Sequence, residues 1–329
     1  MTTPDWQAAK ALIDSATRIV AVTHIYPDGD AIGSLMATTL TLRALGKQVT
    51  PVVDGGTPPH LAFIPQSGGV ASGLAPNFTA DLVISLDASD TRRLGESGKA
   101  ALALGTPVLM VDHHATNLLF GTVNLLNVVT PATCEVLVDW FDAMDWPIEK
   151  DAATALLTGI VTDTLAFRIS QTTTDTLAKA QRLMLAGASL TAITQQTVNR
   201  RSTAAFRLWA KVMPTLQIEN GAIWAVVDRE AKQAAQYTEE GGAGGLAQLL
   251  NEADEAFVTG VFVERTNGDV EMHFRAQPGY NVGALALSLG GGGHILASGA
   301  TVPGPLAEVV ARVVPLLKEV AKAGTLIVA

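Results

Sequence analysis

Three potential metal ligands lie within seven residues near the N-terminus. His24, Asp28 and Asp30 belong to the segment HIYPDGDAIGS at residues 24–34, which directly follows the apolar run RIVAVT at residues 18–23. Carboxylate and imidazole groups together suit manganese or a similar divalent ion better than a thiolate-seeking metal. An Asp in such a segment is equally well explained as a turn residue or a helix cap. This segment alone therefore does not decide between metal binding and a capped turn.

Further acids and histidines follow other apolar runs of the chain. The residues in this position are Asp87, Asp112, His113, His114 and Asp163. If the runs are strands of one parallel sheet, the residues at their carboxyl ends meet at one crevice. Two unpaired carboxylates about 4 Å apart repel each other by about 4 kcal/mol at an effective dielectric of about 20. Because divalent cations remove that repulsion, the pattern favours a metal centre.

The N-terminal half alternates strand-like runs with helical patterns. We predict strands at residues 18–23, 49–53, 82–86 and 108–111, and a helix at residues 31–45. Continuous Val, Ile and Leu strands separated by helices indicate an α/β fold, with a doubly wound, mostly parallel sheet covered on both faces. Residues 131–215 have a helical pattern, with Pro131 near a predicted start.

The last third of the chain is predicted to form a smaller α/β unit. It contains predicted strands at residues 223–227, 256–263 and 270–275, a hairpin turn at 266–269 and a helix near 305–322. The predicted division of the chain is a catalytic domain at residues 1–190, a helical linker or hinge at 191–215 and a second domain at 216–329.

Composition excludes several classes of protein. The chain has 329 residues, a length that suggests about two domains. Of these residues 48% are hydrophobic and 16% charged, a balance that argues against disorder. Its net charge of −9 disfavours tight binding to a long nucleic acid, and its one cysteine excludes an internal disulfide framework. The N-terminus lacks a signal-peptide pattern, and no apolar run is long enough to cross a bilayer. We expect a soluble, cytoplasmic protein with no membrane partner.

A run of four glycines at residues 290–293 ends in His294. Such a run is ordinarily a flexible loop. Here it lies between two apolar segments, and glycines allow backbone N–H groups to close around phosphate oxygens. Arg275 ends the preceding predicted strand. The C-terminal unit is therefore a candidate for phosphate or nucleotide binding.

Five segments, in order along the chain, resemble the motifs of one family. HIYPDGDAIGS, DASDTRRLG, DHHATNLLFG and TGIVTDTLAFR resemble the four motifs of the DHH-family phosphoesterases, which take their name from a triplet such as Asp112-His113-His114. GGGGHILASG resembles the GGGH motif of the DHH-associated C-terminal domain. The resemblance covers nearly the whole chain.

The resemblance implies two divalent cations, with Mn²⁺ expected. Two sets of side chains would hold them, His24 with Asp28 for one ion and Asp30 with His113 and Asp163 for the other. Asp87 would bridge the two ions, and His114 would contact the scissile phosphate. Asp112 would orient the histidines. Together these residues would hydrolyse a phosphoester with metal-activated water.

The same resemblance implies a nucleotide substrate. The residues that would hold its distal part are Arg275, Gly291, Gly292, Gly293, His294 and Ser298. Length and the glycine motif favour the stand-alone group that cleaves short oligonucleotides (nanoRNA) to mononucleotides and removes the 3′-phosphate of 3′-phosphoadenosine 5′-phosphate (pAp). Two alternatives stay open: a phosphodiesterase acting mainly on cyclic or linear di-adenylate, and a catalytically silent nucleotide-binding protein. The sequence also leaves open whether the chain forms a homodimer.

Overall fold

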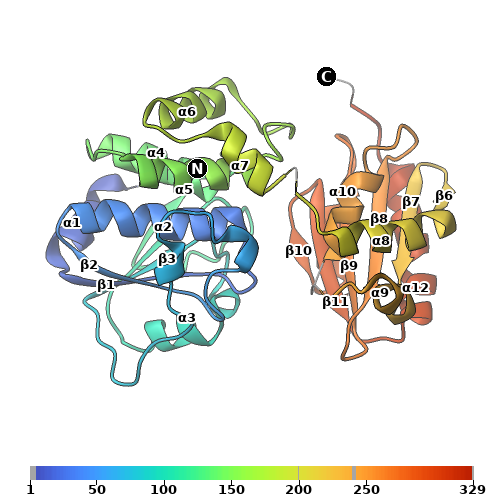
Figure 1. Ribbon diagram of the computed structural model, residues 1–329, viewed down its shortest axis with the longest axis horizontal. Coiled ribbons are helices and arrows are strands. Elements are labelled where there is room, and N and C mark those ends of the chain that lie inside the picture. Colours follow the sequence, from blue (N-terminus) through green and yellow to red (C-terminus); the bar gives the residue numbers. More distant parts are fainter. Residues whose placement is uncertain (1–4, 199, 239–241, 328–329) are drawn as a thin grey trace. The chain divides into compact units, whose positions relative to one another are not determined.

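The chain divides into two compact units, Met1–Arg200 and Arg201–Ala329. The computed structural model describes residues 5–198, 200–238 and 242–327. In Figure 1 the first unit runs from blue to yellow-green and the second from yellow to red. The boundary between the units lies inside the segment 191–215. No helix in the described ranges is long and apolar enough to cross a membrane.

The first unit contains a five-stranded parallel sheet in the order β2-β1-β3-β4-β5. Its strands are β1 (Arg18–Thr23), β2 (Gln48–Val52), β3 (Leu82–Leu86), β4 (Val108–Asp112) and β5 (Val123–Leu126). Its α-helices are α1 (Trp6–Ser15), α2 (Gly29–Ala44), α3 (Gly95–Leu102), α4 (Thr133–Ala143), α5 (Lys150–Asp163), α6 (Thr174–Leu185) and α7 (Leu190–Gln196). The predicted parallel α/β sheet is confirmed. Strand β5 was not predicted, because a four-residue run containing Asn124 carries little strand signal.

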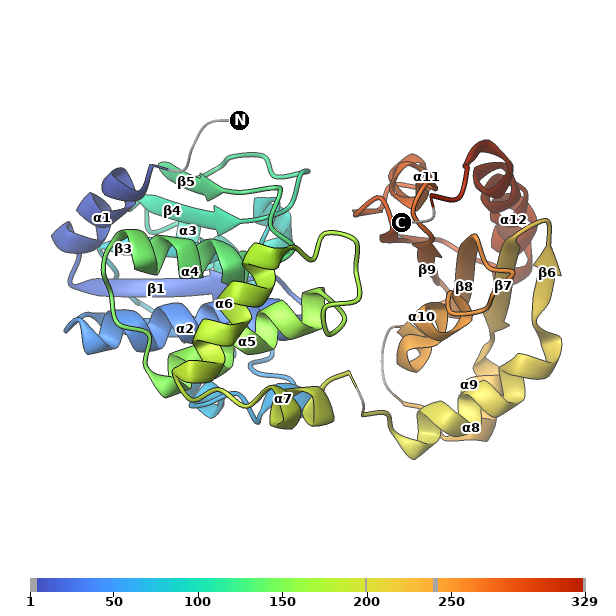
Figure 2. The ribbon, with the colours of Figure 1, turned by 90° about the horizontal axis from the view of Figure 1, so that it is seen from above.

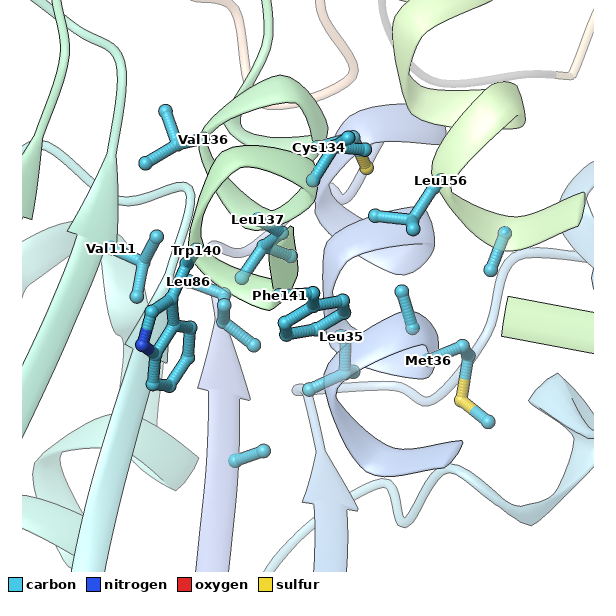
Figure 3. Packing of buried hydrophobic residues seen from close by; sticks show 14 of the residues in the cluster. Leu35, Met36, Leu86, Val111, Cys134, Val136, Leu137, Trp140, Phe141 and Leu156 are labelled. Carbon is cyan, nitrogen blue, oxygen red and sulfur yellow. The ribbon is translucent and has the colours of Figure 1, made fainter. Parts of the chain in front are cut away.

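Helices cover both faces of this sheet. Helices α1 and α2 lie on one face and α3 on the other (Figure 1). Figure 3 shows Trp140 of α4 beside Val111 of β4, while Phe141 of α4 points toward Leu35 of α2. Helix α2 also packs closely on α5, since a Cβ at Gly33 would lie 2.6 Å from the carbonyl oxygen of Ala155. Nearer the helix ends, a Cβ at Gly29 would lie 2.4 Å from the Thr162 side chain, so the start of α2 lies against the end of α5.

The strand order places a topological switch point between β1 and β3. The chain passes from β1 to β2 on one side and later returns to β3 on the other side of β1. Ligands of such sheets bind beyond the carboxyl ends of the strands at this point. The segments after β1, β3 and β4 all end at this edge, and they carry the acids and histidines singled out from the sequence.

The second unit contains a six-stranded mixed sheet in the order β10-β11-β9-β8-β7-β6, in which only the pair β7–β8 is parallel. Its strands are β6 (Gln217–Glu219), β7 (Ala222–Val227), β8 (Val258–Glu264), β9 (Val270–Ala276), β10 (Gly292–Gly293) and β11 (Ala297–Val302). Its α-helices are α8 (Thr203–Val212), α9 (Arg229–Ala235), α10 (Leu246–Leu250), α11 (Val282–Ser288) and α12 (Leu306–Ala323). Helices α8 and α10 pack on one face and α11 and α12 on the other (Figure 2). The glycine run forms edge strand β10, which the sequence did not predict.

Candidate functional site

The first group of site residues follows β1. His24 comes directly after the strand, is buried, and has its Nδ1 2.8 Å from the carbonyl oxygen of Ile25. Asp28 is the N-cap of α2, where its Oδ1 accepts hydrogen bonds from the backbone N–H groups of Asp30 (3.1 Å) and Ala31 (3.0 Å). The helix-cap interpretation is therefore correct for Asp28. The cap does not exclude metal binding, because the same Oδ1 lies 3.9 Å from Nε2 of His24.

Asp87 lies at the centre of the cluster. It follows β3 with a left-handed backbone (φ 56°) and a buried side chain. Its Oδ2 lies 3.5 Å from Nε2 of His24, while its Oδ1 lies 3.7 Å from Nε2 of His113. Burial alone would raise the pKa of Asp87, but the close approach of His24 and the charges of the nearby histidines outweigh burial and lower it. Asp87 is thus held as a carboxylate between two imidazoles.

Asp112 orients the DHH triplet. Its Oδ1 accepts a hydrogen bond from the backbone N–H of His113 (2.8 Å) and lies 2.7 Å from Nδ1 of His114, while its Oδ2 accepts from Nδ2 of Asn117 (2.6 Å). Burial lowers the pKa of His114, but the hydrogen bond with Asp112 and the charge of Asp87 dominate and raise it to about 9. His114 therefore carries a positive charge at neutral pH. Asn117 was not among the predicted site residues, because no feature of the sequence distinguishes it from any polar turn residue.

Asp30, His113 and Asp163 form a second set. Nε2 of His113 lies 3.5 Å from Oδ2 of Asp163, and Nδ1 of His113 lies 3.3 Å from the carbonyl oxygen of Thr130. Asp163 is the last residue of α5, so it reaches the cluster from a helix and not from a strand end. Burial, together with neighbouring carboxylate charges, raises the pKa of both Asp30 and Asp163. Without a cation, these two carboxyls therefore hold a proton more tightly than exposed carboxyls do.

These residues fit a pair of divalent cations. Ligand atoms of His24, Asp28 and Asp87 lie within 4.8 Å of one another, as do those of Asp30, His113 and Asp163. The histidine–carboxylate separations of 3.5 to 3.9 Å exceed normal hydrogen bonds. They approach the roughly 3.0–3.4 Å between adjacent ligands of one ion with bonds of about 2.1 Å. In both His24 and His113 a carbonyl oxygen contacts Nδ1, which directs Nε2 toward the carboxylates.

The N-terminus of α4 adds contacts that sequence analysis missed. The backbone N–H groups of Thr133 and Cys134 donate to Oδ2 (2.6 Å) and Oδ1 (3.0 Å) of Asp30. The Thr133 hydroxyl donates to Oδ1 of Asp87 (2.9 Å). A Thr at a predicted helix start is common, and without β5 the sequence did not indicate that α4 begins at this crevice.

The remaining predicted residues belong to the second unit. Strand β10 pairs with β11, and a Cβ at Gly291 would lie only 2.1 Å from the carbonyl oxygen of Gly299. Gly293 has φ +129°, a conformation that favours glycine. Gly292 is exposed and has open space where a Cβ would stand. His294 closes the turn between β10 and β11, its backbone N–H donating to the carbonyl oxygen of Ala297 (2.8 Å).

Arg275 and Ser298 lie on neighbouring strands. The Nη1 of Arg275, on β9, donates to the carbonyl oxygen of Phe274 (2.8 Å). Its Nε is buried with no hydrogen-bond partner among the described residues, and burial lowers the pKa of the guanidinium. Ser298 is buried on β11, and its hydroxyl donates to the carbonyl oxygen of Val282 (2.7 Å) at the start of α11. Arg275 thus has one guanidinium donor without a partner among the described residues, whereas the Ser298 hydroxyl already contacts α11.

Known proteins resemble this chain over most of its length. It is 30% identical over 306 residues to the bifunctional oligoribonuclease and PAP phosphatase NrnA of Thermus thermophilus, covering 92% of this chain and 89% of that protein. An exopolyphosphatase-related protein of Bacteroides fragilis superposes with a TM-score of 0.87 at 22% identity, covering 96% of each chain. RecJ of T. thermophilus in complex with Mn²⁺ superposes with a TM-score of 0.58 at 17% identity, covering 99% of this chain and 56% of RecJ. The two structural likenesses concern the fold alone.

Family models match both units. The model of the DHH family N-terminal domain matches residues 18–160, and that of the DHHA1 domain matches residues 223–323. The two models match in the order in which the motifs occur, and the identity to the Thermus protein extends across both. The chain belongs to the DHH family.

Proposed function

We propose that this chain is a metal-dependent phosphoesterase that cleaves short oligonucleotides to mononucleotides and removes the 3′-phosphate of pAp. The observation that carries the proposal is the buried cluster around Asp87, in which carboxylates and imidazoles stand at distances suited to shared cations. The similarity to an oligoribonuclease and PAP phosphatase over 92% of the chain supports this choice of substrate.

Two divalent cations, with Mn²⁺ expected, are the cofactors of the proposed reaction. His24 and Asp28 would hold one ion, Asp30, His113 and Asp163 the other, and Asp87 both. When bound, such a pair neutralises charge on phosphate oxygens and makes hydroxide available near neutral pH. The two oxygens of Asp87 face different histidines, which supports the bridging role.

His114 is a cation that the chain itself places at this centre. Asp112 holds its ring through Nδ1, and in the metal-free protein this contact raises the pKa of His114 to about 9. A protonated imidazole donates a charge-assisted hydrogen bond to a phosphate oxygen, which strengthens as negative charge develops in the transition state. We assign His114 this contact with the scissile phosphate.

The second unit would supply nucleotide binding. The half-buried guanidinium of Arg275 would bind a phosphate, and edge strand β10 presents glycine backbone without side chains in the way. The cluster around Asp87 and the hairpin formed by β10 and β11 belong to different units. Segment 191–215 would therefore act as the hinge during turnover. Gly291, Gly292, Gly293 and His294 would approach the substrate, while Ser298 would mainly hold the hairpin against α11.

A panel of substrates tests this function. Metal-free protein is assayed with pAp, di- to tetraribonucleotides and cyclic di-adenylate, without metal and with Mn²⁺ or Mg²⁺, with Asp87→Ala as a control for contaminating phosphatase. We expect metal-dependent release of phosphate from pAp and of mononucleotides from the oligonucleotides. Nucleotide binding without turnover would favour the silent binding protein, and a higher kcat/KM for cyclic di-adenylate would favour the alternative phosphodiesterase. Full activity after verified removal of metal would contradict the two-cation centre.

A further inference from the structure

Thr133 links two carboxylates that the proposed function assigns to different roles. It is the first residue of α4 and is fully buried. Its backbone N–H donates to Asp30, a ligand of one ion, and its hydroxyl donates to Asp87, the bridging ligand. One residue therefore holds both side chains.

We propose that Thr133 is a positioning residue of the metal centre, whose hydroxyl fixes the Asp87 carboxylate while its backbone N–H fixes Asp30 at the spacing two cations require. This inference rests on the proposed function, because it presumes that the cluster binds metal. Groups that hydrogen-bond metal ligands from outside the ligand set orient those ligands and tune the affinity for the ion.

The hydroxyl contacts one particular oxygen of Asp87. It donates to Oδ1, the oxygen that lies 3.7 Å from Nε2 of His113, whereas Oδ2 faces His24. This bond fixes the rotation of the carboxylate about its last torsion, which is otherwise broad. The Thr133 hydroxyl should therefore matter most for the ion that His113 holds with Asp30 and Asp163.

The hydroxyl is not needed to build the helix. The N-cap of α4 is Ala132, whose side chain makes no cap hydrogen bond. At the first helical position, Thr133 also has no carbonyl one turn earlier in the helix to which its hydroxyl could donate. Its hydrogen bond instead goes to Asp87, a residue 46 positions away in the sequence.

Asp30 has little room to move if these bonds are lost. A Cβ at Gly159 of α5 would lie 2.4 Å from Oδ1 of Asp30 and 2.3 Å from Sγ of Cys134. Helix α5 thus packs directly against the Asp30 carboxylate on one side. On the other side, the first two N–H groups of α4 donate hydrogen bonds to it. Because Thr133→Val keeps the backbone N–H, that substitution isolates the bond to Asp87.

The test compares metal binding in variants that differ only by the hydroxyl. Thr133→Val keeps the branched shape, and Thr133→Ser keeps the hydroxyl. The matched control is Thr39→Val, because Thr39 is equally buried and its hydroxyl donates only to the carbonyl oxygen of Leu35. Mn²⁺ binding to metal-free protein is measured by titration calorimetry, and the thermal unfolding of the metal-free protein is followed in parallel.

We expect Thr133→Val to weaken Mn²⁺ binding by about ten- to a hundredfold, with one of the two binding steps affected more than the other. Thr133→Ser and Thr39→Val should bind like the wild type, and the metal-free unfolding temperatures of Thr133→Val and Thr39→Val should change equally little. If Thr133→Val does not fold, the pair Thr133→Ser and Thr133→Ala, which both lack the methyl group, gives the same comparison.

Each outcome has a distinct meaning. Wild-type affinity at both steps in Thr133→Val, or in Thr133→Ala where the Val variant does not fold, overturns the positioning role while leaving the proposed function intact. A wild-type protein that binds no divalent cation overturns the proposed function itself. A loss in Thr133→Val that Thr133→Ser shares equally assigns the effect to packing and also overturns the inference.

Discussion

The two units differ in how their candidate site residues are presented. The centre of the first unit is made of buried charged side chains, with Asp87 2%, His113 3% and His24 4% exposed. The hairpin of the second unit is made of exposed backbone, at Gly292 and Gly293, beside one guanidinium, that of Arg275. Buried charges need counter-ions to neutralise them. An exposed strand edge already offers its unpaired backbone groups to a ligand. Changes in the first should therefore alter metal content, and changes in the second should alter substrate binding.

Asp87→Ala should have the largest effect. Its carboxylate oxygens face the histidines of both sets, so its loss removes a shared ligand from each ion. We expect kcat to fall by more than about a hundredfold, beyond the range for partners outside the ligand set, with loss of both ions. Metal content by elemental analysis and kcat on pAp provide the check. Retention of two tightly bound ions would refute the bridging role.

His114→Ala separates phosphate contact from metal binding within the same unit. The ring of His114 is held by Asp112, and its positive charge is proposed to contact the scissile phosphate. We expect metal content to stay near wild type while kcat falls about a hundredfold, as for other lost transition-state donors. If His114→Ala loses metal and Asp87→Ala keeps it, the two roles are reversed.

Arg275→Ala should affect only substrates that reach the second unit. Removal of a charge-assisted phosphate contact costs about 1.5–3 kcal/mol, or about ten- to a hundredfold in kcat/KM for pAp and dinucleotides. A minimal ester such as bis-p-nitrophenyl phosphate should be hydrolysed at the wild-type rate. Steady-state kinetics with both substrate types decide the matter. Equal losses on the two would mean that Arg275 serves the fold or the metal centre.

A pair of glycine substitutions distinguishes fold from access in the hairpin. Gly291→Ala places a Cβ against the carbonyl oxygen of Gly299, so we expect a lower unfolding temperature. Gly292→Ala meets no neighbour, so its unfolding temperature should be unchanged. If substrate approaches this backbone, Gly292→Ala should still raise KM for pAp severalfold. An unchanged KM would remove Gly292 from the substrate site.

The pH dependence of the metal-free protein should be the smallest effect. The pKa of His114 is raised from its ordinary 6.5 to about 9, so the folded state holds this proton more tightly than the unfolded state. The resulting stabilisation is fully present below pH 6.5 and is lost as the pH rises through about 9. We expect the unfolding temperature to fall by several degrees across this window. In His114→Asn the slope should be shallower; an identical slope would exclude His114 as its source.

Much of the site follows from the order of residues along the chain. An apolar run that ends in Asp87, and another that ends in the triplet from Asp112 to His114, already predict a parallel sheet with acids and imidazoles at its carboxyl edge. Side-chain chemistry then indicates divalent cations. The glycine run predicts a segment whose backbone N–H groups can approach phosphate oxygens closely. Its form as edge strand β10 did not follow from the sequence.

Apart from the motif resemblance, only tertiary structure separates one strand-end Asp from another. Asp54 follows β2 much as Asp87 follows β3, yet its carboxylate accepts the backbone N–H groups of Glu96 (2.7 Å) and Ser97 (2.8 Å) at the start of α3. Strand β2 lies at the edge of the sheet, away from the switch point between β1 and β3. An acid at the switch point faces other acids and imidazoles, while one at the sheet edge meets the N–H groups of a helix start. The sequence determines which residues end the strands, and the strand order determines which of them face one another.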